Sequence, residues 1–188
     1  MVAERLAGEL RARGALLSGH FRLSSGRHSD RFVQKFRILE DPRLVEPIAG
    51  AIADAARAFR PTVVVSAAVG GIVLGYEVAR ALGTRAIFVE KEGGVPALRR
   101  GFELGATDRA LVVEDVMTTG QSVREVLDVV RAHGAEVVAV ATIVRREPQD
   151  FDVPSIALLD LPVASFDPAE CPLCAEGRPL SEPGSRRL

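Results

Sequence analysis

The sequence predicts an α/β domain with a doubly wound, mainly parallel sheet and a small N-terminal hood. Short apolar runs rich in β-branched residues, such as residues 62–66 and 110–113, alternate with segments of helical periodicity. These runs lack the apolar–polar alternation of a half-exposed sheet, so helices should cover both faces. The length of 188 residues, with 47% hydrophobic and 26% charged residues, is typical of one globular domain.

The first forty residues are predicted to form the hood. Residues 2–13 carry apolar side chains at helical spacing, and Gly14 ends this helix. Residues 15–40 look irregular, with short extended pieces at 20–23 and 32–36. An amphipathic helix over 39–59 follows, with Asp41-Pro42 at its N-cap and first turn.

The core is predicted from alternating strands and helices. Strands are expected at 62–66, 85–89, 110–113, 136–144 and 155–159, and helices at 72–82 and 122–133. Gly83 and Gly134 end the two helices. A single domain over residues 1–188 therefore divides into the hood (1–40), an α/β core (41–165) and a C-terminal tail (166–188) rich in proline, glycine and charge.

Charge and hydropathy exclude several classes of protein. Twenty-four basic residues against twenty-five acidic ones leave a net charge of −1, so there is no bulk positive field to attract nucleic acid. The longest uncharged stretch, residues 61–76, is too short to span a membrane. Charges at Glu4, Arg5 and Glu9 argue against a signal peptide. We expect a cytoplasmic protein that binds neither nucleic acid nor a membrane.

The motif LVVEDVMTTGQS, residues 111–122, carries the most chemical information. A buried strand ends in two adjacent carboxylates, Glu114 and Asp115, and a turn then opens a helix. The free N–H groups of a helix N-terminus suit a phosphate, and Gly120 permits close approach. Hydroxyl donors come from Thr118, Thr119 and Ser122.

The two carboxylates would repel a phosphate, so they suit the cis-diol of a ribose or positive charge on a sugar ring. The alternative is that they only cap the helix. The turn lacks the lysine of a nucleotide-triphosphate P-loop, which excludes that class.

This motif resembles the phosphoribosyl diphosphate (PRPP) signature of type I phosphoribosyltransferases. Among these enzymes the chain most resembles the orotate phosphoribosyltransferases, over nearly its whole length. GHFRLSSGRHSDRFVQK, residues 19–35, is similar to a segment that helps form their orotate pocket, and CPLCAEGRPLSEPGSR resembles the tail of a shorter, thermophile-type subgroup. The resemblance implies the type I fold. It also implies transfer of the phosphoribosyl group from PRPP to orotate, giving orotidine 5′-phosphate and diphosphate in de novo pyrimidine (UMP) biosynthesis.

The same resemblance gives roles to individual residues. Glu114 and Asp115 would hold the ribose hydroxyls and, with Lys91, form the catalytic set. The PRPP site would comprise Glu114, Asp115, Val116, Met117, Thr118, Thr119, Gly120, Gln121 and Ser122.

The resemblance also assigns the groups around the signature. SAAVGG, residues 66–71, matches the diphosphate loop, in which Val69 and Gly70 would contact the diphosphate. Orotate would meet Thr118, Arg146, Phe32 and Lys35. The planar guanidinium of Arg146 would pair with the orotate carboxylate. The alternative makes Arg145-Arg146 a solvated basic pair at a strand end.

Residues 90–101 depart from the family pattern. Many members have a mobile catalytic loop reading Arg-Lys-x-x-Lys-x-His-Gly, of which only Lys91 matches a basic position here. We expect Lys91, with Arg99 or Arg100, to neutralise the leaving diphosphate. The segment is polar and glycine-rich, as a closing lid should be. Alternatively, Arg99-Arg100 is the solvated edge of a hairpin.

Cofactor and assembly follow from the resemblance. Mg²⁺ is the expected cofactor, held mainly by PRPP oxygens and water, with no ligand from the protein. A homodimer is expected, in which the lid serves the neighbouring active site.

Two other functions remain open. One is a purine phosphoribosyltransferase acting on adenine, xanthine or hypoxanthine by the same PRPP chemistry. Arg146 and the SGRHSDRF segment favour an acidic pyrimidine, because these purines bring no carboxylate. The other is a non-catalytic PRPP-sensing regulator, which would need a nucleic-acid surface.

Cys171 and Cys174 form a lone CxxC motif near the C-terminus, with no histidine close in sequence. A structural zinc site needs four ligands. The pair could be a redox couple, a partial metal site completed across a dimer, or two ordinary thiols in a turn. The absence of a thioredoxin-like context favours the last.

Overall fold

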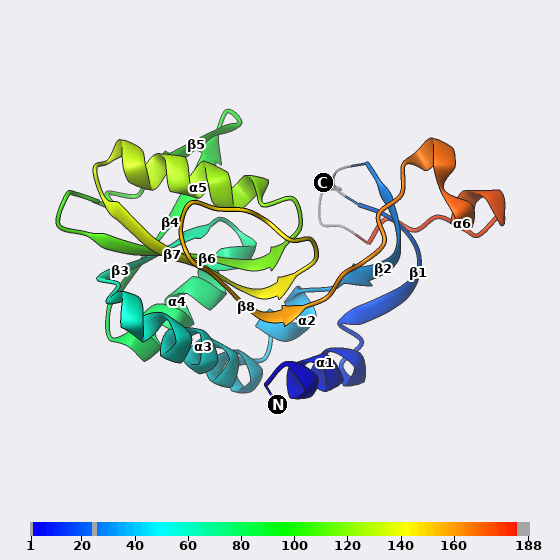
Figure 1. Cartoon of the computed structure of the whole chain (residues 1–188), viewed down its shortest axis with the longest axis horizontal. Helices are drawn as coiled ribbons and strands as arrows, with labels where there is room; N and C mark the ends of the chain where they lie inside the picture. Colours follow the sequence, from blue (N-terminus) through cyan, green and yellow to red (C-terminus); the bar gives the residue numbers. More distant parts are fainter. Residues whose placement is uncertain (1, 24–25, 184–188) are drawn as a thin grey trace.

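A six-stranded sheet with strand order β5-β4-β3-β6-β7-β8 forms the centre of the molecule (Figure 1). The computed structural model describes residues 2–23 and 26–183. Five strands run parallel, and β5 is antiparallel to β4. The strands are β3 (Val63–Ala67), β4 (Arg85–Glu92), β5 (Val95–Leu98), β6 (Arg109–Met117), β7 (Glu136–Arg145) and β8 (Ser155–Asp160). The predicted α/β fold with a mainly parallel sheet is confirmed.

Helices cover both faces of this sheet. Helices α3 (Pro42–Ala56) and α4 (Gly70–Leu82) lie on one face, and α5 (Gln121–Ala132) lies on the other (Figure 1). Successive strand residues serve opposite faces: Val64 packs into the core with α3 and α4, whereas Val63 and Val65 pack into the core with α5. The strands are therefore apolar throughout, which is why the sequence shows runs rather than alternation.

The hood contains more regular structure than the sequence predicted. Helix α1 (Val2–Ala12) precedes an antiparallel hairpin of β1 (Leu16–Arg22) and β2 (His28–Val33). Residues 36–39, expected to be partly extended, form the short helix α2 (Phe36–Leu39). The long helix begins at Pro42 rather than residue 39, because Asp41 is extended and accepts a hydrogen bond from the Arg43 N–H. It ends in a 3₁₀ turn, Arg57–Phe59.

Two core strands are longer than predicted. Strand β6 continues to Met117, so Glu114 and Asp115 lie within the strand and not after it. Strand β4 continues to Glu92 and turns through Gly93-Gly94 into β5, so a hairpin occupies the region expected to be a loop.

The tail runs back along the hood. It holds a 3₁₀ turn (Pro168–Glu170) and the short helix α6 (Pro172–Ala175). The backbone of His28 exchanges hydrogen bonds of 2.9 and 2.8 Å with Phe166, and the Ser181 N–H donates to the His20 carbonyl at 2.8 Å. The tail thus lies beside β1 and β2 (Figure 1). Residues 24–25 of the pocket segment and residues 184–188 of the tail lie outside the described residues. The boundaries at 40 and 166 stay a prediction.

The length and hydropathy of the helices decide whether any of them could span a membrane. Across residues 2–23 and 26–183, the structure contains no helix that is both long enough and apolar enough to cross a bilayer.

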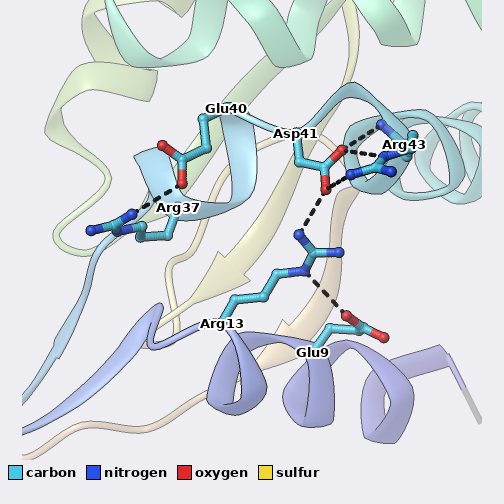
Figure 2. Close-up of polar contacts among 6 residues, drawn as sticks. All are labelled: Glu9, Arg13, Arg37, Glu40, Asp41 and Arg43. Atoms are coloured by element: carbon cyan, nitrogen blue, oxygen red, sulfur yellow. Dashed lines mark hydrogen bonds and ion pairs between the residues drawn. The ribbon is translucent and has the colours of Figure 1, made fainter.

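Charged side chains join the hood to the core at the start of α3. The Arg13 guanidinium donates to Asp41 Oδ2 at 2.7 Å and to Glu9 at 3.3 Å, and Arg43 contacts Asp41 from the other side (Figure 2). Hydrogen bonds from Arg43 and then Arg13 lower the pKa of Asp41 to about 2. One carboxylate therefore caps α3 and also holds α1 against it.

The Asp41→Ala variant should be less stable than the wild type, because it loses both the helix cap and the contact with α1. We expect Tm at pH 7 to fall by about 2–5 °C in calorimetry. The pKa of Asp41 is lowered on folding, so its contribution is present above pH 3.8 and is lost as the pH falls towards 2. The difference between the two proteins should shrink over that range.

The control is Asp54→Ala, which removes an exposed carboxylate on the same helix, paired only with Arg57 at i+3. Its Tm should stay within about 1 °C of the wild type. An equal fall in both variants would contradict the role given to Asp41.

Candidate active site

Two adjacent carboxylates on β6 form the centre of the site. Glu114 is 8% exposed and Asp115 is 1% exposed. The Lys35 ammonium, from the segment between β2 and α2, lies 2.8 Å from Asp115 Oδ2 and donates to Oδ1 at 3.1 Å. The structure thus brings together Lys35, expected at the orotate site, and Asp115, expected at the ribose, across 80 residues of sequence.

The Glu114 carboxyl group is buried, and the Lys35 ammonium pairs with Asp115. Burial, and then the charge of Asp115, raise the pKa of Glu114 to about 8, although Lys35 lowers it in part. Glu114 Oε1 also accepts a hydrogen bond from the Asp115 N–H at 3.0 Å. Near pH 7 the raised pKa of Glu114 therefore favours its protonated form in the free protein.

The loop after β3 lies directly against this pair. A Cβ at Gly70 would come within 3.0 Å of both Asp115 Oδ2 and Lys35 Nζ. A Cβ at Gly71 would lie 3.3 Å from the Val113 carbonyl oxygen. The Ala68–Val69 peptide is cis, and Val69 is 74% exposed beside Gly70. The glycines let the backbone of the predicted diphosphate loop approach the acidic pair without a side chain between them.

The turn between β6 and α5 forms a small pocket. Its lining is Glu114, Val116, Met117, Thr118, Thr119, Gly120, Gln121, Ser122 and Val123. Gly120 begins α5 at φ 74°, a conformation that favours glycine. It has no side chain to cap the helix, and only a long contact of 3.4 Å links Thr119 Oγ1 to the Gln121 N–H. The turn can therefore offer backbone N–H groups and hydroxyls to an anion.

Arg146 is a buried cation beside this turn. It is 7% exposed, and burial lowers the pKa of its guanidinium. Nη2 donates to Ser29 Oγ at 3.4 Å, and Nε has no hydrogen-bond partner within residues 2–23 and 26–183. The Arg146 N–H donates to the Met117 carbonyl at 2.9 Å, which holds Arg146 next to the turn. A buried guanidinium with so few partners is suited to an anionic ligand.

Phe32 packs against another aromatic ring of the hood. Its ring packs against Phe21 at a centroid distance of 5.8 Å and is half-buried. Its place in an orotate pocket stays a prediction.

The basic residues of the β4–β5 hairpin are each paired with a carboxylate. Lys91 contacts Glu125 at 2.8 Å, Arg99 contacts Glu92 at 2.5 Å, and Arg100 binds Glu90 through two nitrogens. Gln121 also donates to Glu125 at 3.1 Å, so Lys91 lies close to the start of α5. The roles expected for Lys91, Arg99 and Arg100 at the diphosphate stay predictions.

Sequence analysis missed three polar residues that support the site. Ser29 is fully buried and donates to the Ala164 carbonyl at 2.8 Å. Thr142 on β7 donates to the Asp115 carbonyl at 3.1 Å. Gln149 donates to the Thr118 carbonyl at 3.1 Å. Ser29 lies in the quoted SGRHSDRF segment, which was the available signal, whereas nothing local distinguished Thr142 or Gln149.

Glu114 should make stability fall as pH rises. Its pKa is raised on folding from 4.5 to about 8, so between these values the folded state binds more protons than the unfolded state. We expect urea unfolding to show the wild type losing on the order of 2 kcal/mol relative to Glu114→Gln between pH 5 and 8.5. Parallel curves for the two proteins would exclude the raised pKa.

Gly70→Ala should disturb the contact between Lys35 and Asp115, because the new methyl group would overlap both. We expect a loss of about 1–3 kcal/mol in urea unfolding. The matched control is Gly50→Ala in α3, where an added Cβ meets nothing within 4 Å. That change should be neutral or stabilising by up to about 1 kcal/mol. A neutral Gly70→Ala would show that the loop does not lie this close to Asp115.

Comparisons with known proteins agree with this geometry. The phosphoribosyl transferase domain model matches residues 36–156. The chain is 49% identical over 172 residues to the orotate phosphoribosyltransferase of Caldanaerobacter subterraneus subsp. tengcongensis, covering 90% of each chain. It is 51% identical over 176 residues to that of Heliobacterium modesticaldum, covering 92% of each.

A solved structure extends the likeness to three dimensions. The crystal structure of orotate phosphoribosyltransferase from Aeropyrum pernix superposes with a TM-score of 0.71 at 27% identity, over 83% of this chain and 93% of that one. The fold of this chain is thus similar to that of the solved structure along most of the length of both chains. The chain therefore belongs to the phosphoribosyltransferase family and, within it, to the orotate phosphoribosyltransferases.

Proposed function

We propose that this chain transfers the 5-phosphoribosyl group from PRPP to N1 of orotate, releasing diphosphate and forming orotidine 5′-phosphate in de novo pyrimidine (UMP) biosynthesis. The observation that carries the choice of base is the buried Arg146 guanidinium next to the β6–α5 turn. Orotate brings a carboxylate that would satisfy this cation. Adenine, hypoxanthine and xanthine bring none.

The β6–α5 turn would bind the 5-phosphate of PRPP. The hydroxyls of Thr118, Thr119 and Ser122 and the first backbone N–H groups of α5 can converge on phosphate oxygens. Glu114 and Asp115 would accept hydrogen bonds from the ribose hydroxyls. Gly70, which lies against Asp115, and the preceding Val69 would place the diphosphate beside the same sugar.

Catalysis would rest on position and charge. As the bond between C1 and the diphosphate oxygen breaks, its electron pair leaves with the diphosphate and the sugar ring becomes positive. The negative charge of Asp115 would stabilise that ring, and Glu114 would add to it once PRPP binding releases its proton. N1 of orotate then forms the new bond to C1 and gives up its own proton to solvent. Lys35, held on Asp115, is placed to contact either orotate or a phosphate oxygen.

Mg²⁺ fits this site as a companion of the substrate. Oxygen donors are the ligands it prefers, and PRPP itself supplies several. When bound, the ion would neutralise part of the diphosphate charge. We propose that PRPP and water hold it, and that Lys91 with Arg99 or Arg100 adds positive charge after release from Glu125, Glu92 and Glu90.

We also propose a homodimer. Val69, Val73 and Tyr76 are 74%, 45% and 64% exposed, and their spacing places them along one side of α4 and its entry. Such an apolar strip is suited to burial between subunits. Light scattering of the purified chain measures its molar mass in solution, which should be that of two chains. The cytoplasmic location and the lack of a nucleic-acid partner stay predictions.

The first experiment compares bases. Purified protein with Mg²⁺ and PRPP should consume orotate, followed by its ultraviolet absorbance, and should leave adenine, hypoxanthine, xanthine and uracil unchanged. Turnover of a purine would keep the PRPP site and overturn the role of Arg146. Tight PRPP binding with no turnover of any base would favour the regulator.

The Arg146→Lys variant should bind orotate more weakly while binding PRPP almost unchanged. Lysine keeps the charge but loses the planar pair of donors, so we expect KM for orotate to rise at least about tenfold, with KM for PRPP within about twofold. Steady-state kinetics with each substrate varied measures both values.

The matched control is Arg145→Lys, the same change one residue earlier. The Arg145 side chain donates to Asp160 at 2.6 and 3.0 Å. Its replacement by lysine should therefore leave both KM values unchanged. Equal KM values for orotate in the two variants would place the carboxylate contact elsewhere.

A further inference from the structure

Four side chains that could bind a metal meet at the junction of the hood and the tail. They are His20 on β1, His28 on β2, and Cys171 and Cys174 at the start of α6. Their candidate ligand atoms all lie within 4.8 Å of one another. The CxxC motif has no histidine close to it in sequence. The structure brings two histidines to it from about 150 residues earlier in the same chain.

The distances within this cluster match those around one tetrahedral ion. His20 Nε2 lies 3.0 Å from His28 Nδ1, 3.6 Å from Cys171 Sγ and 3.7 Å from Cys174 Sγ. Cys174 Sγ lies 3.3 Å from His28 Nδ1. A tetrahedral zinc ion with bonds of about 2.0 Å to nitrogen and 2.3 Å to sulfur separates its ligand atoms by about 3.3–3.8 Å. Four of the six distances between the ligand atoms thus already lie close to those of such a site, and all four atoms lie within 4.8 Å of one another.

A contact outside the cluster orients the ring of His20. Its Nδ1 lies 2.9 Å from the Arg178 carbonyl oxygen. A carbonyl oxygen can only accept, so Nδ1 donates to it, and Nε2 is the ring nitrogen that faces His28 and the two sulfurs. Metal-binding histidines are oriented by this kind of second hydrogen bond.

The surroundings close the cluster on most sides. His20, His28 and Cys171 are 4%, 6% and 3% exposed, while Cys174 is exposed. Both cysteines are free thiols, so no disulfide ties them together. Two imidazoles and two thiols form a donor set that prefers zinc over Mg²⁺.

We propose that His20, His28, Cys171 and Cys174 bind one structural Zn²⁺ ion. Four protein ligands leave no open position for a substrate, and two thiolates balance the charge of the ion. The ion would lock the tail onto the β1–β2 hairpin. It would also brace the base pocket, because Ser29 follows His28 and binds both the Ala164 carbonyl and Arg146.

The test measures metal in the full chain. Protein purified under reducing conditions and dialysed against metal-free buffer should contain about one zinc per chain by plasma mass spectrometry. The double variant Cys171→Ser, Cys174→Ser should contain less than about one tenth of that. The control is His133→Gln, which removes the remaining histidine, bonded to the Val129 carbonyl on α5, and should retain the full zinc content.

Cobalt provides a second readout, which does not depend on the variants folding. Wild-type protein loaded with Co²⁺ in place of zinc should show the intense visible bands of a tetrahedral ion and a thiolate-to-cobalt charge-transfer band, and excess Mg²⁺ should not displace the ion. Removal of zinc with a chelator should lower Tm by about 5 °C or more. Neither measurement involves orotate or PRPP, so a failed activity assay would leave this result intact.

Three outcomes would overturn the proposal. They are wild-type protein that holds no zinc even after zinc is added, a weak octahedral cobalt spectrum, and a Cys171–Cys174 disulfide that re-forms in air after zinc has been supplied to the reduced protein. Full zinc content in the cysteine double variant would likewise place the ion at another site.

Discussion

The burial of two adjacent carboxylates on β6 is the constraint on which the site depends. Glu114 and Asp115 lie among apolar strands, where two full negative charges would be strongly unfavourable. Two features make the arrangement tolerable: Glu114 retains a proton near neutral pH, and Lys35 supplies a cation to Asp115. A third, the missing side chain of Gly70, leaves space for that lysine. A strand, a loop and the hood are thus coupled through one ion pair.

The hood consequently contributes residues to the candidate active site. It delivers Lys35 to Asp115 and Ser29 to Arg146, and charged contacts around Asp41 hold it against the core helix α3. The tail supports the hood in turn through Ala164, Phe166 and the cysteines. A zinc ion at the junction would stabilise the same series of contacts. In that series the tail holds the β1–β2 hairpin, and the hairpin holds Ser29 against Arg146.

Local sequence was enough for most elements because local chemistry determines them. Asp41-Pro42 caps α3, Gly83 ends α4 at φ 73°, and apolar runs mark strands covered on both faces. The same holds for the phosphate turn, whose residues are contiguous. The ends of strands were harder to predict from local sequence. Strand β6 continues past its two acidic residues because β7 pairs with it as far as Met117, whose partner, Arg145, lies 28 residues later in the chain. Pairing with β5 likewise extends β4 beyond its apolar run.

The sequence by itself determined the fold class, the acidic strand and the turn that follows it, whereas the role of Arg146 came from a family resemblance and stays a prediction. The first three features depend on residues within about a dozen positions of one another. Tertiary structure alone decided that Lys35 reaches Asp115, that Arg146 is buried beside Ser29, and that His20 and His28 meet Cys171 and Cys174. These contacts join segments 80 to 154 residues apart, and no local spacing encodes them, because they form only when the sheet, hood and tail pack together.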